Sequence, residues 1–267
     1  MNNNTVKPLR ILSVGNSFSM DQQTYVHQMA KTAGLDITVI NAYIGGCTFG
    51  THLRELLSSN YQYQLNGCEV IENGWSLDRF IELGNWDFIT FQPGTHGLTR
   101  LLPEEPYYLT QLLEYVKHKN NDQNTKYVLN FSWSDGDSST RSFFNEYFGR
   151  SRDSMLGEFV KIAKSAVENG VKYIIPGGYA VENGYKVYGN RMYRDGFHAS
   201  ELARYMHACL WFEFFTGLEV PESFTPEKPS YDGGILPTAE ERETLRLIAS
   251  DSLKQVKEWA FCPEIFK

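Results

Sequence analysis

Short apolar runs rich in Val, Ile, Leu and Phe alternate with amphipathic segments along most of the chain. Each run is bounded by Gly, Pro, Asn or Ser, the residues that most often form turns. Strands of a parallel sheet have this continuous apolar character, because helices cover both faces of the sheet. The runs predict five strands, at residues 10–14, 37–42, 87–92, 127–133 and 173–176.

Apolar residues recur at helical spacing between these strands and after the last one. Capping boxes, in which Ser or Thr is followed three residues later by Gln or Glu, mark helix starts at Ser19 and Thr238. The pattern predicts helices at residues 19–34, 52–59, 106–120, 156–170, 200–210 and 238–256. Strand followed by helix, repeated five times, indicates an α/β fold with a parallel sheet between two layers of helices.

The organisation of the chain predicts one domain over residues 1–267, because no repeat or low-complexity segment divides it. Residues 60–75 alternate loosely between apolar and polar side chains and predict a hairpin insertion. Asn66-Gly67, a favourable pair for a tight hairpin, would form its turn. A Pro-rich loop and one helix complete the chain over residues 219–267.

The composition of the chain excludes several classes of protein. It has a net charge of −7, which disfavours nucleic acid as a partner, and lacks the apolar run of about 20 residues that a membrane-spanning helix needs. The N-terminal residues lack the apolar core of a signal peptide, which predicts a cytoplasmic protein as written, or a periplasmic or secreted one if a signal peptide was removed. The four cysteines are expected to be reduced, with a Cys47–Cys68 bridge as the alternative in an exported protein.

Polar residues follow the predicted strands at the ends where ligands bind in open parallel sheets. Ser17 follows the first strand, Gly46 the second and Gln92 the third, while Asp195 and His198 lie beyond the fifth. A serine, a flexible glycine, an amide and an Asp/His pair are the groups that acyl transfer requires. Three residues separate Asp195 from His198, so the carboxylate can hold one ring nitrogen while the other faces Ser17.

These motifs resemble the SGNH (GDSL) hydrolase superfamily. Gly15-Asn16-Ser17 resembles the first conserved sequence block of this superfamily, and the stretch NAYIGG, which ends at Gly46, resembles the second. Asp195-x-x-His198 resembles the last block. The sequences of the stretches GNSFS, WDFITFQ and RDGFHAS are most similar to those of an uncharacterised bacterial branch of the superfamily. The third block departs from the family pattern, since Gln92 stands where the family has a Gly-x-Asn-Asp motif.

The resemblance implies a three-layer α/β/α, flavodoxin-like fold with five parallel strands in the order 2-1-3-4-5. It also implies a serine esterase that hydrolyses small acyl esters, such as O-acetyl groups on carbohydrates, through the triad Ser17, His198 and Asp195. The N–H groups of Ser17 and Gly46, and the side chain of Gln92, would then form the oxyanion hole. The expected partner is a small-molecule ester, with no cofactor and no metal.

Each of these residues also has a purely structural interpretation. Ser17 is the nucleophile or a helix cap, and we favour the nucleophile, with Ser19 as the cap. Gln92 is an oxyanion donor or a brace for its loop. Two other functions stay open: a metal-dependent hydrolase using Asp195, His198 and His96, and a non-catalytic module that binds a glycan on the same fold. A nucleotide cofactor is unsupported, because the chain has neither a Gly-x-Gly-x-x-Gly motif nor a P-loop.

Overall fold

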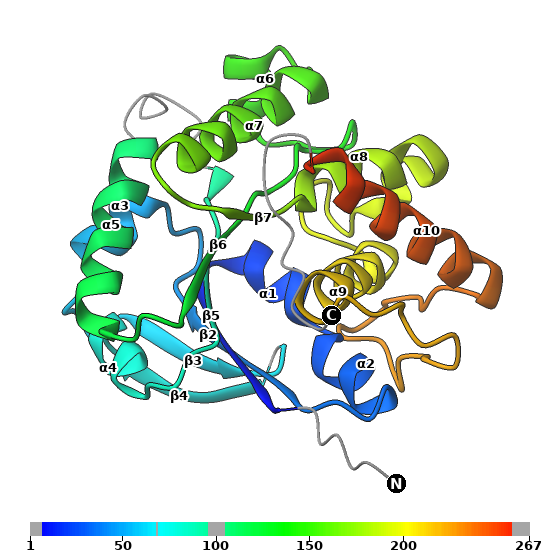
Figure 1. Cartoon of the computed structure of the whole chain (residues 1–267). Helices are drawn as coiled ribbons and strands as arrows, with labels where there is room; N and C mark the ends of the chain where they lie inside the picture. The colour runs from blue at the N-terminus through cyan, green and yellow to red at the C-terminus, as the bar shows by residue number, and fades with distance from the viewer. Residues whose placement is uncertain (1–6, 68, 96–104, 258–267) are drawn as a thin grey trace, which may run out of the picture.

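A seven-stranded sheet lies at the centre of the computed structural model, which describes residues 7–67, 69–95 and 105–257 (Figure 1). The order of the strands is β4-β3-β2-β1-β5-β6-β7. The five strands β2, β1, β5, β6 and β7 are parallel and stand in the order expected from the sequence. The strands are β1 (Leu9–Gly15), β2 (Ile37–Tyr43), β3 (Tyr61–Leu65), β4 (Glu69–Trp75), β5 (Phe88–Phe91), β6 (Lys126–Asn130) and β7 (Tyr173–Ile175).

The expected number of five strands is corrected to seven, because the predicted hairpin joins the sheet. Its first strand, β3, pairs antiparallel with β2, and β4 then pairs antiparallel with β3. The hairpin therefore satisfies the backbone groups along the edge of β2 and places its own outer strand at the new edge. Asn66 lies in the turn with φ of 47°, in the left-handed region that asparagine tolerates.

Helices cover both faces of the sheet (Figure 1). On one side α1, α2, α8 and α9 form a core with Leu9, Ile11 and Val39, and α10 packs against the outside of α9. On the other side α3, α4, α5, α6 and α7 form a second core with Leu12 and Val14. Successive residues of β1 thus face opposite cores, as the pleat of a strand requires. The three-layer α/β/α fold predicted from the sequence is confirmed.

All six predicted helices are present, with two corrections near the N-terminus, whereas α4, α6, α8 and η2 were not predicted from the sequence. The first predicted helix is divided into α1 and α2, and α3 begins at Phe49 because Thr48 caps it. The predicted capping box at Thr238 and Glu241 is present at the start of α10. The helices are α1 (Ser17–Gln23), α2 (Val26–Thr32), α3 (Phe49–Arg54), α4 (Leu77–Glu82), α5 (Glu105–Asn120), α6 (Ser142–Phe148), α7 (Arg152–Glu168), α8 (Gly177–Tyr188), η2 (Gly189–Met192), α9 (Glu201–Thr216) and α10 (Ala239–Gln255).

Helix α9 is buried along almost its whole length, between the sheet and α10. No helix among the described residues is both long and apolar enough to cross a membrane.

His207 lies on α9 and stacks on Trp133, with 4.8 Å between the ring centroids. Neither ring nitrogen of His207 has a hydrogen-bond partner among the described residues, and full burial lowers the pKa of His207 to about 3.

The buried, neutral state of His207 predicts an acid-sensitive fold. As the pH falls, the His207 imidazole of the unfolded chain, with a pKa of about 6.5, is protonated before that of the folded chain, with a pKa of about 3. Protonation therefore favours the unfolded state, and stability is lost as the pH falls from 6.5 toward 3. In His207→Phe, which keeps a ring against Trp133, that loss should disappear. Urea unfolding at pH 7 and pH 5 should therefore show the wild type losing about 2 kcal/mol more than the variant. Equal losses in the two proteins would contradict a neutral buried His207.

Candidate active site

Ser17 is placed by the junction of β1 and α1. The strand ends at Gly15, and Asn16 caps the helix by accepting a hydrogen bond from the Phe18 N–H at 3.0 Å. Ser17 is the first helical residue, so its own N–H has no acceptor within the helix. Asn16 is therefore the cap, which corrects the prediction that Ser19 plays this role.

Ser19 instead holds the start of the helix to the neighbouring strand. It is fully buried, and its hydroxyl contacts the Asn16 carbonyl oxygen at 2.7 Å and Asn41 Oδ1, on β2, at 3.0 Å. The side chain of Asn16 also donates to the Cys47 carbonyl oxygen at 2.8 Å. These contacts fix the turn that carries Ser17 against the end of β2.

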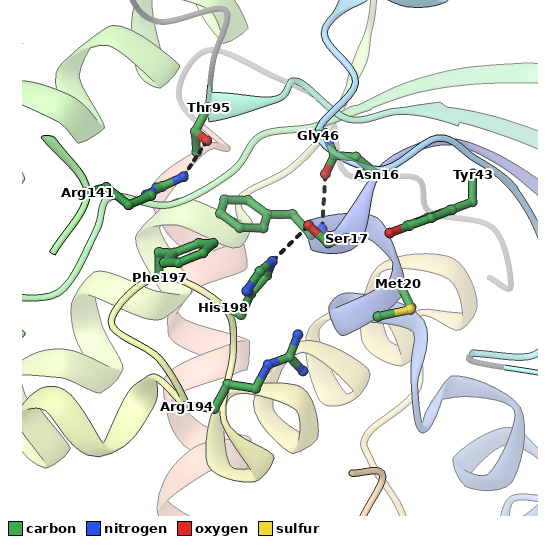
Figure 2. Close-up of a pocket in the computed structure, with 11 residues that line it drawn as sticks. Asn16, Ser17, Met20, Tyr43, Gly46, Thr95, Arg141, Arg194, Phe197 and His198 are labelled. Carbon is green, nitrogen blue, oxygen red and sulfur yellow. Dashed lines mark hydrogen bonds between the residues drawn. The ribbon is translucent and has the colours of Figure 1, made fainter. Parts of the chain in front are cut away.

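The structure brings Ser17, His198 and Asp195 into one hydrogen-bonded chain, of which Figure 2 shows the contact between Ser17 and His198. Ser17 Oγ lies 2.9 Å from His198 Nε2, and His198 Nδ1 lies 2.7 Å from Asp195 Oδ2. A carboxylate accepts hydrogen bonds only, so the proton of the neutral ring is on Nδ1 and Nε2 is free to accept the serine proton. The three side chains thus have the geometry of a nucleophile, a base and an orienting acid.

Asp195 is held in its ionised form. Partial burial raises its pKa, but hydrogen bonds from the His198 ring and from the backbone N–H groups of His198 and Phe197 outweigh this effect. The net result is a pKa well below the ordinary value for aspartate. Asp195 therefore stays charged across the pH range in which an imidazole titrates, and it stabilises the imidazolium form of its neighbour.

The loop that carries Asp195 and His198 is fixed by backbone contacts. Gly196 adopts φ of 89° and lies so close to Ser139 that a side chain at this position would collide with the Ser139 backbone. Its carbonyl oxygen accepts a hydrogen bond from the Gly136 N–H at 2.8 Å, and that of Phe197 accepts one from Trp133 Nε1 at 2.8 Å. Hydrogen bonds from the segment after β6 therefore hold this loop in place.

Asp21, a residue that the sequence analysis did not identify, ties the same loop to the helix of Ser17. It lies one turn after Ser17 on α1 and is fully buried. Its Oδ2 accepts a hydrogen bond from the Ala199 N–H at 2.9 Å, and its Oδ1 accepts one from Arg194 Nη1 at 3.2 Å. One carboxylate thus holds both ends of loop 194–199. The spacing of four residues from Ser17 was the available signal, because it places both side chains on one face of a helix.

A cavity of about 370 Å³ opens in front of Ser17 and His198 (Figure 2). Its lining comes from the ends of β1 and β2, the start of α1, the segment after β5, the residue before α6 and the loop before α9. Gly46 lines the cavity with φ of 64°, which favours glycine, and its N–H makes no hydrogen bond to any described residue. The lining residues are Asn16, Ser17, Phe18, Met20, Tyr43, Gly46, Thr95, Arg141, Arg194, Phe197 and His198.

Gln92 is not brought into this lining. It is fully buried behind the cavity, and its amide nitrogen donates to the Pro93 carbonyl oxygen and to Ser132 Oγ. Ser132 Oγ also donates to the Pro93 carbonyl oxygen at 2.8 Å. The side chain of Gln92 is therefore used in holding the segment that leads from β5 to Thr95.

The residues considered for metal binding are only partly within the described structure. Asp195 and His198 face each other, whereas His96, the third member of the set, lies outside the described residues. Within residues 7–67, 69–95 and 105–257, no group of three His, Cys, Asp or Glu side chains lies close enough to hold a metal ion. Cys47 and Cys209 are free and buried, while Cys68 and Cys262 lie outside these ranges.

Comparison with known proteins places the chain within a family. A family model described as "Domain of unknown function (DUF4886)" matches residues 10–236. A search of the curated proteins gave no match. The crystal structure of a DUF4886 family protein from Bacteroides uniformis is similar with a TM-score of 0.81 at 23% identity, covering 98% of this chain and 100% of that one.

Two further solved structures extend the similarity of fold. A candidate SGNH hydrolase from Slackia heliotrinireducens and a candidate GDSL-like lipase from Parabacteroides merdae each give a TM-score of 0.53 at 18% identity. Each similarity covers 78% of this chain, and 98% and 95% of the other chains respectively. These similarities confirm the predicted SGNH hydrolase fold.

The central position of Asp21 predicts a specific effect of Asp21→Asn. Asp21→Asn removes the negative charge that Arg194 and the buried Arg204 share, so the free energy of unfolding should fall by about 3 kcal/mol. Hydrogen–deuterium exchange should also speed up in loop 194–199 before it does in the sheet. The matched control is Asp251→Asn, which removes an exposed ion pair with Lys254 and should cost less than about 1 kcal/mol. Equal effects of the two substitutions would contradict this role of Asp21.

Proposed function

Because the chain belongs to the DUF4886 family and has the fold of SGNH hydrolases, we propose that it is a serine esterase acting on small acyl esters. The observation that carries the proposal is the pair of hydrogen bonds from Ser17 to His198 and from His198 to Asp195. A serine at the start of a helix has no structural need for such a chain, since Asn16 already caps that helix.

In the proposed mechanism, His198 Nε2 accepts the proton of Ser17 as Ser17 Oγ attacks the ester carbonyl carbon. Asp195 holds the ring in the required tautomer and stabilises the imidazolium that forms. His198 then gives the proton to the leaving alcohol, and an acyl group remains on Ser17. Water, activated by the same imidazole, releases the acid and restores the serine.

The oxyanion is proposed to be held by the N–H groups of Ser17 and Gly46. Both residues line the cavity, and neither N–H has a partner among the described residues that would compete with the oxyanion. Backbone donors that are fixed before the reaction stabilise the charge of the transition state without reorganisation. For Gln92 we favour the brace over the donor, because its amide nitrogen already donates to Pro93 and Ser132.

The size of the cavity supports a small substrate. A volume of about 370 Å³ lies at the lower end of the range for small-molecule sites. It accommodates a short acyl group together with part of an alcohol such as a sugar, so O-acetylated carbohydrates remain within the proposal. A non-catalytic glycan-binding module would use the same cavity without a reactive serine, and the two functions differ in what happens to Ser17.

Removal of the hydroxyl in Ser17→Ala should abolish turnover of 4-nitrophenyl acetate. The loss expected for a catalytic serine is on the order of 10⁶-fold in kcat, since binding and the oxyanion donors alone leave little acceleration. Ser154→Ala is the matched control, because Ser154 also lies in the first turn of a helix, is exposed and does not line the cavity. Its kcat should equal that of the wild type.

Circular dichroism and a thermal melt should show the same fold in all three proteins. Turnover at the wild-type rate by a folded Ser17→Ala protein would overturn the serine mechanism. Absence of turnover in the wild type, together with saturable binding of a glycan, would favour the binding module instead.

A further inference from the structure

The charge on the cavity surface is opposite to that of the whole chain. The chain carries a net charge of −7, yet the cavity lining includes the guanidinium groups of Arg141 and Arg194 and, among the described residues, no carboxylate. Resting on the proposed esterase function, we propose that the ester substrate carries an anionic group, in the simplest case a carboxylate, which binds to Arg194. Arg194 would then be a specificity-determining residue beside the reacting serine.

The carboxylates that balance the two arginines lie behind them. Asp135 and Asp21 are both fully buried, and neither lines the cavity. Asp135 is paired with Arg141, and Asp21 is paired with Arg194. A guanidinium group that is fixed from behind by a buried carboxylate presents its remaining N–H donors forwards, toward solvent and substrate. The charged groups nearest to a substrate in the cavity are therefore the two positive guanidinium groups.

Arg141 has little capacity left for a ligand. Its Nε and Nη2 donate to Asp135, and its Nη1 donates to Thr95 Oγ1 at 2.8 Å. Its guanidinium carbon also lies 4.4 Å and 4.1 Å from the ring centroids of Phe143 and Phe197. These contacts hold Phe197, the residue next to His198, and explain Arg141 as a structural clamp.

Arg194 is different, because most of its donors are unused. Of the described residues, its side chain hydrogen-bonds to Asp21 alone, through Nη1, and 21% of that side chain is exposed. Asp21 also serves the buried Arg204, so its single charge is shared between two guanidinium groups. The next carboxylate of this cluster, Glu201, is buried, bonds to Tyr25 and Ser230, and does not line the cavity.

Tyr43 adds a second donor on the same cavity wall. Figure 2 shows the Tyr43 hydroxyl and the Arg194 guanidinium group both directed toward the space in front of Ser17. The Tyr43 hydroxyl makes no hydrogen bond to any described residue, and burial together with Asp21 raises its pKa, so it stays a neutral donor. A guanidinium group and a phenol are complementary to a carboxylate, which only accepts hydrogen bonds.

The test compares esters that differ only in a carboxylate or its neutral carboxamide. One pair places the group on the alcohol (3-acetoxybenzoate and 3-acetoxybenzamide), and the other on the acyl chain (mono-4-nitrophenyl adipate and its carboxamide). In the wild type, kcat/KM should favour the anionic member of at least one pair by roughly 10- to 100-fold. This ratio should fall to about one in Arg194→Gln and be partly kept in Arg194→Lys.

The matched control is Arg191→Gln, because Arg191 is exposed, pairs with Glu241 and does not line the cavity. Its ratio should equal that of the wild type. Calorimetric titration of the same probes into Ser17→Ala protein, with and without Arg194→Gln, measures the preference in the absence of turnover. The anionic probe should bind about 10-fold tighter, and only while Arg194 is present.

The outcomes separate this inference from the proposed function. Turnover of both members of each pair at equal kcat/KM, or a preference that survives Arg194→Gln, would overturn the anion site and leave the esterase intact. Absence of turnover with an Arg194-dependent binding preference would overturn the esterase and support the anion site. Absence of both turnover and preference would overturn both.

Discussion

One buried carboxylate, Asp21, joins the two segments on which the candidate site depends. It lies on the same helix as Ser17 and binds Arg194 and Ala199, at the two ends of the loop that carries Asp195 and His198. A charge buried in this way is unfavourable unless it is paired, so the loop and the helix are stable only together. The hydrogen bond between residues 17 and 198, which are 181 positions apart, follows from this arrangement.

The sheet determines where this junction forms. Strand β1 lies between β2 and β5, so its carboxyl end delivers Ser17 to the middle of the edge where the neighbouring strands also end. The turn after β2 brings Gly46 to the cavity, and the segment after β5 brings Thr95. Helix α9, buried between the sheet and α10, fixes the loop before it. The cavity therefore has its hydrophobic support from both cores, and its polar groups come from loops, the end of β2 and the start of α1.

The sequence was most informative where one physical pattern dominates. Continuous apolar runs predicted the five parallel strands, and the resemblance to a known family predicted their order. The position of Ser17 after the first strand, with Asp195 and His198 three residues apart, predicted groups that the structure brings into contact. Each of these patterns is local, or rests on the rule that parallel strands end at one edge of the sheet.

Features that depend on tertiary contacts were not predictable in the same way. The helix cap is Asn16 and not Ser19, because Ser19 is buried against Asn41, a residue of another strand. The hairpin adds two strands to the sheet because the edge of β2 is free to pair, which its own pattern does not reveal. The position of the Gln92 side chain depends on its hydrogen bond to Ser132, which lies in the segment after β6.

The most direct measurement of the central claim, that Ser17 is an activated nucleophile, is labelling of the folded protein with a fluorophosphonate probe followed by peptide mass spectrometry. We expect one adduct per chain, located on Ser17, and a labelling rate that falls when His198 is replaced by alanine. A folded protein that stays unlabelled, or an adduct on a different residue, would contradict it.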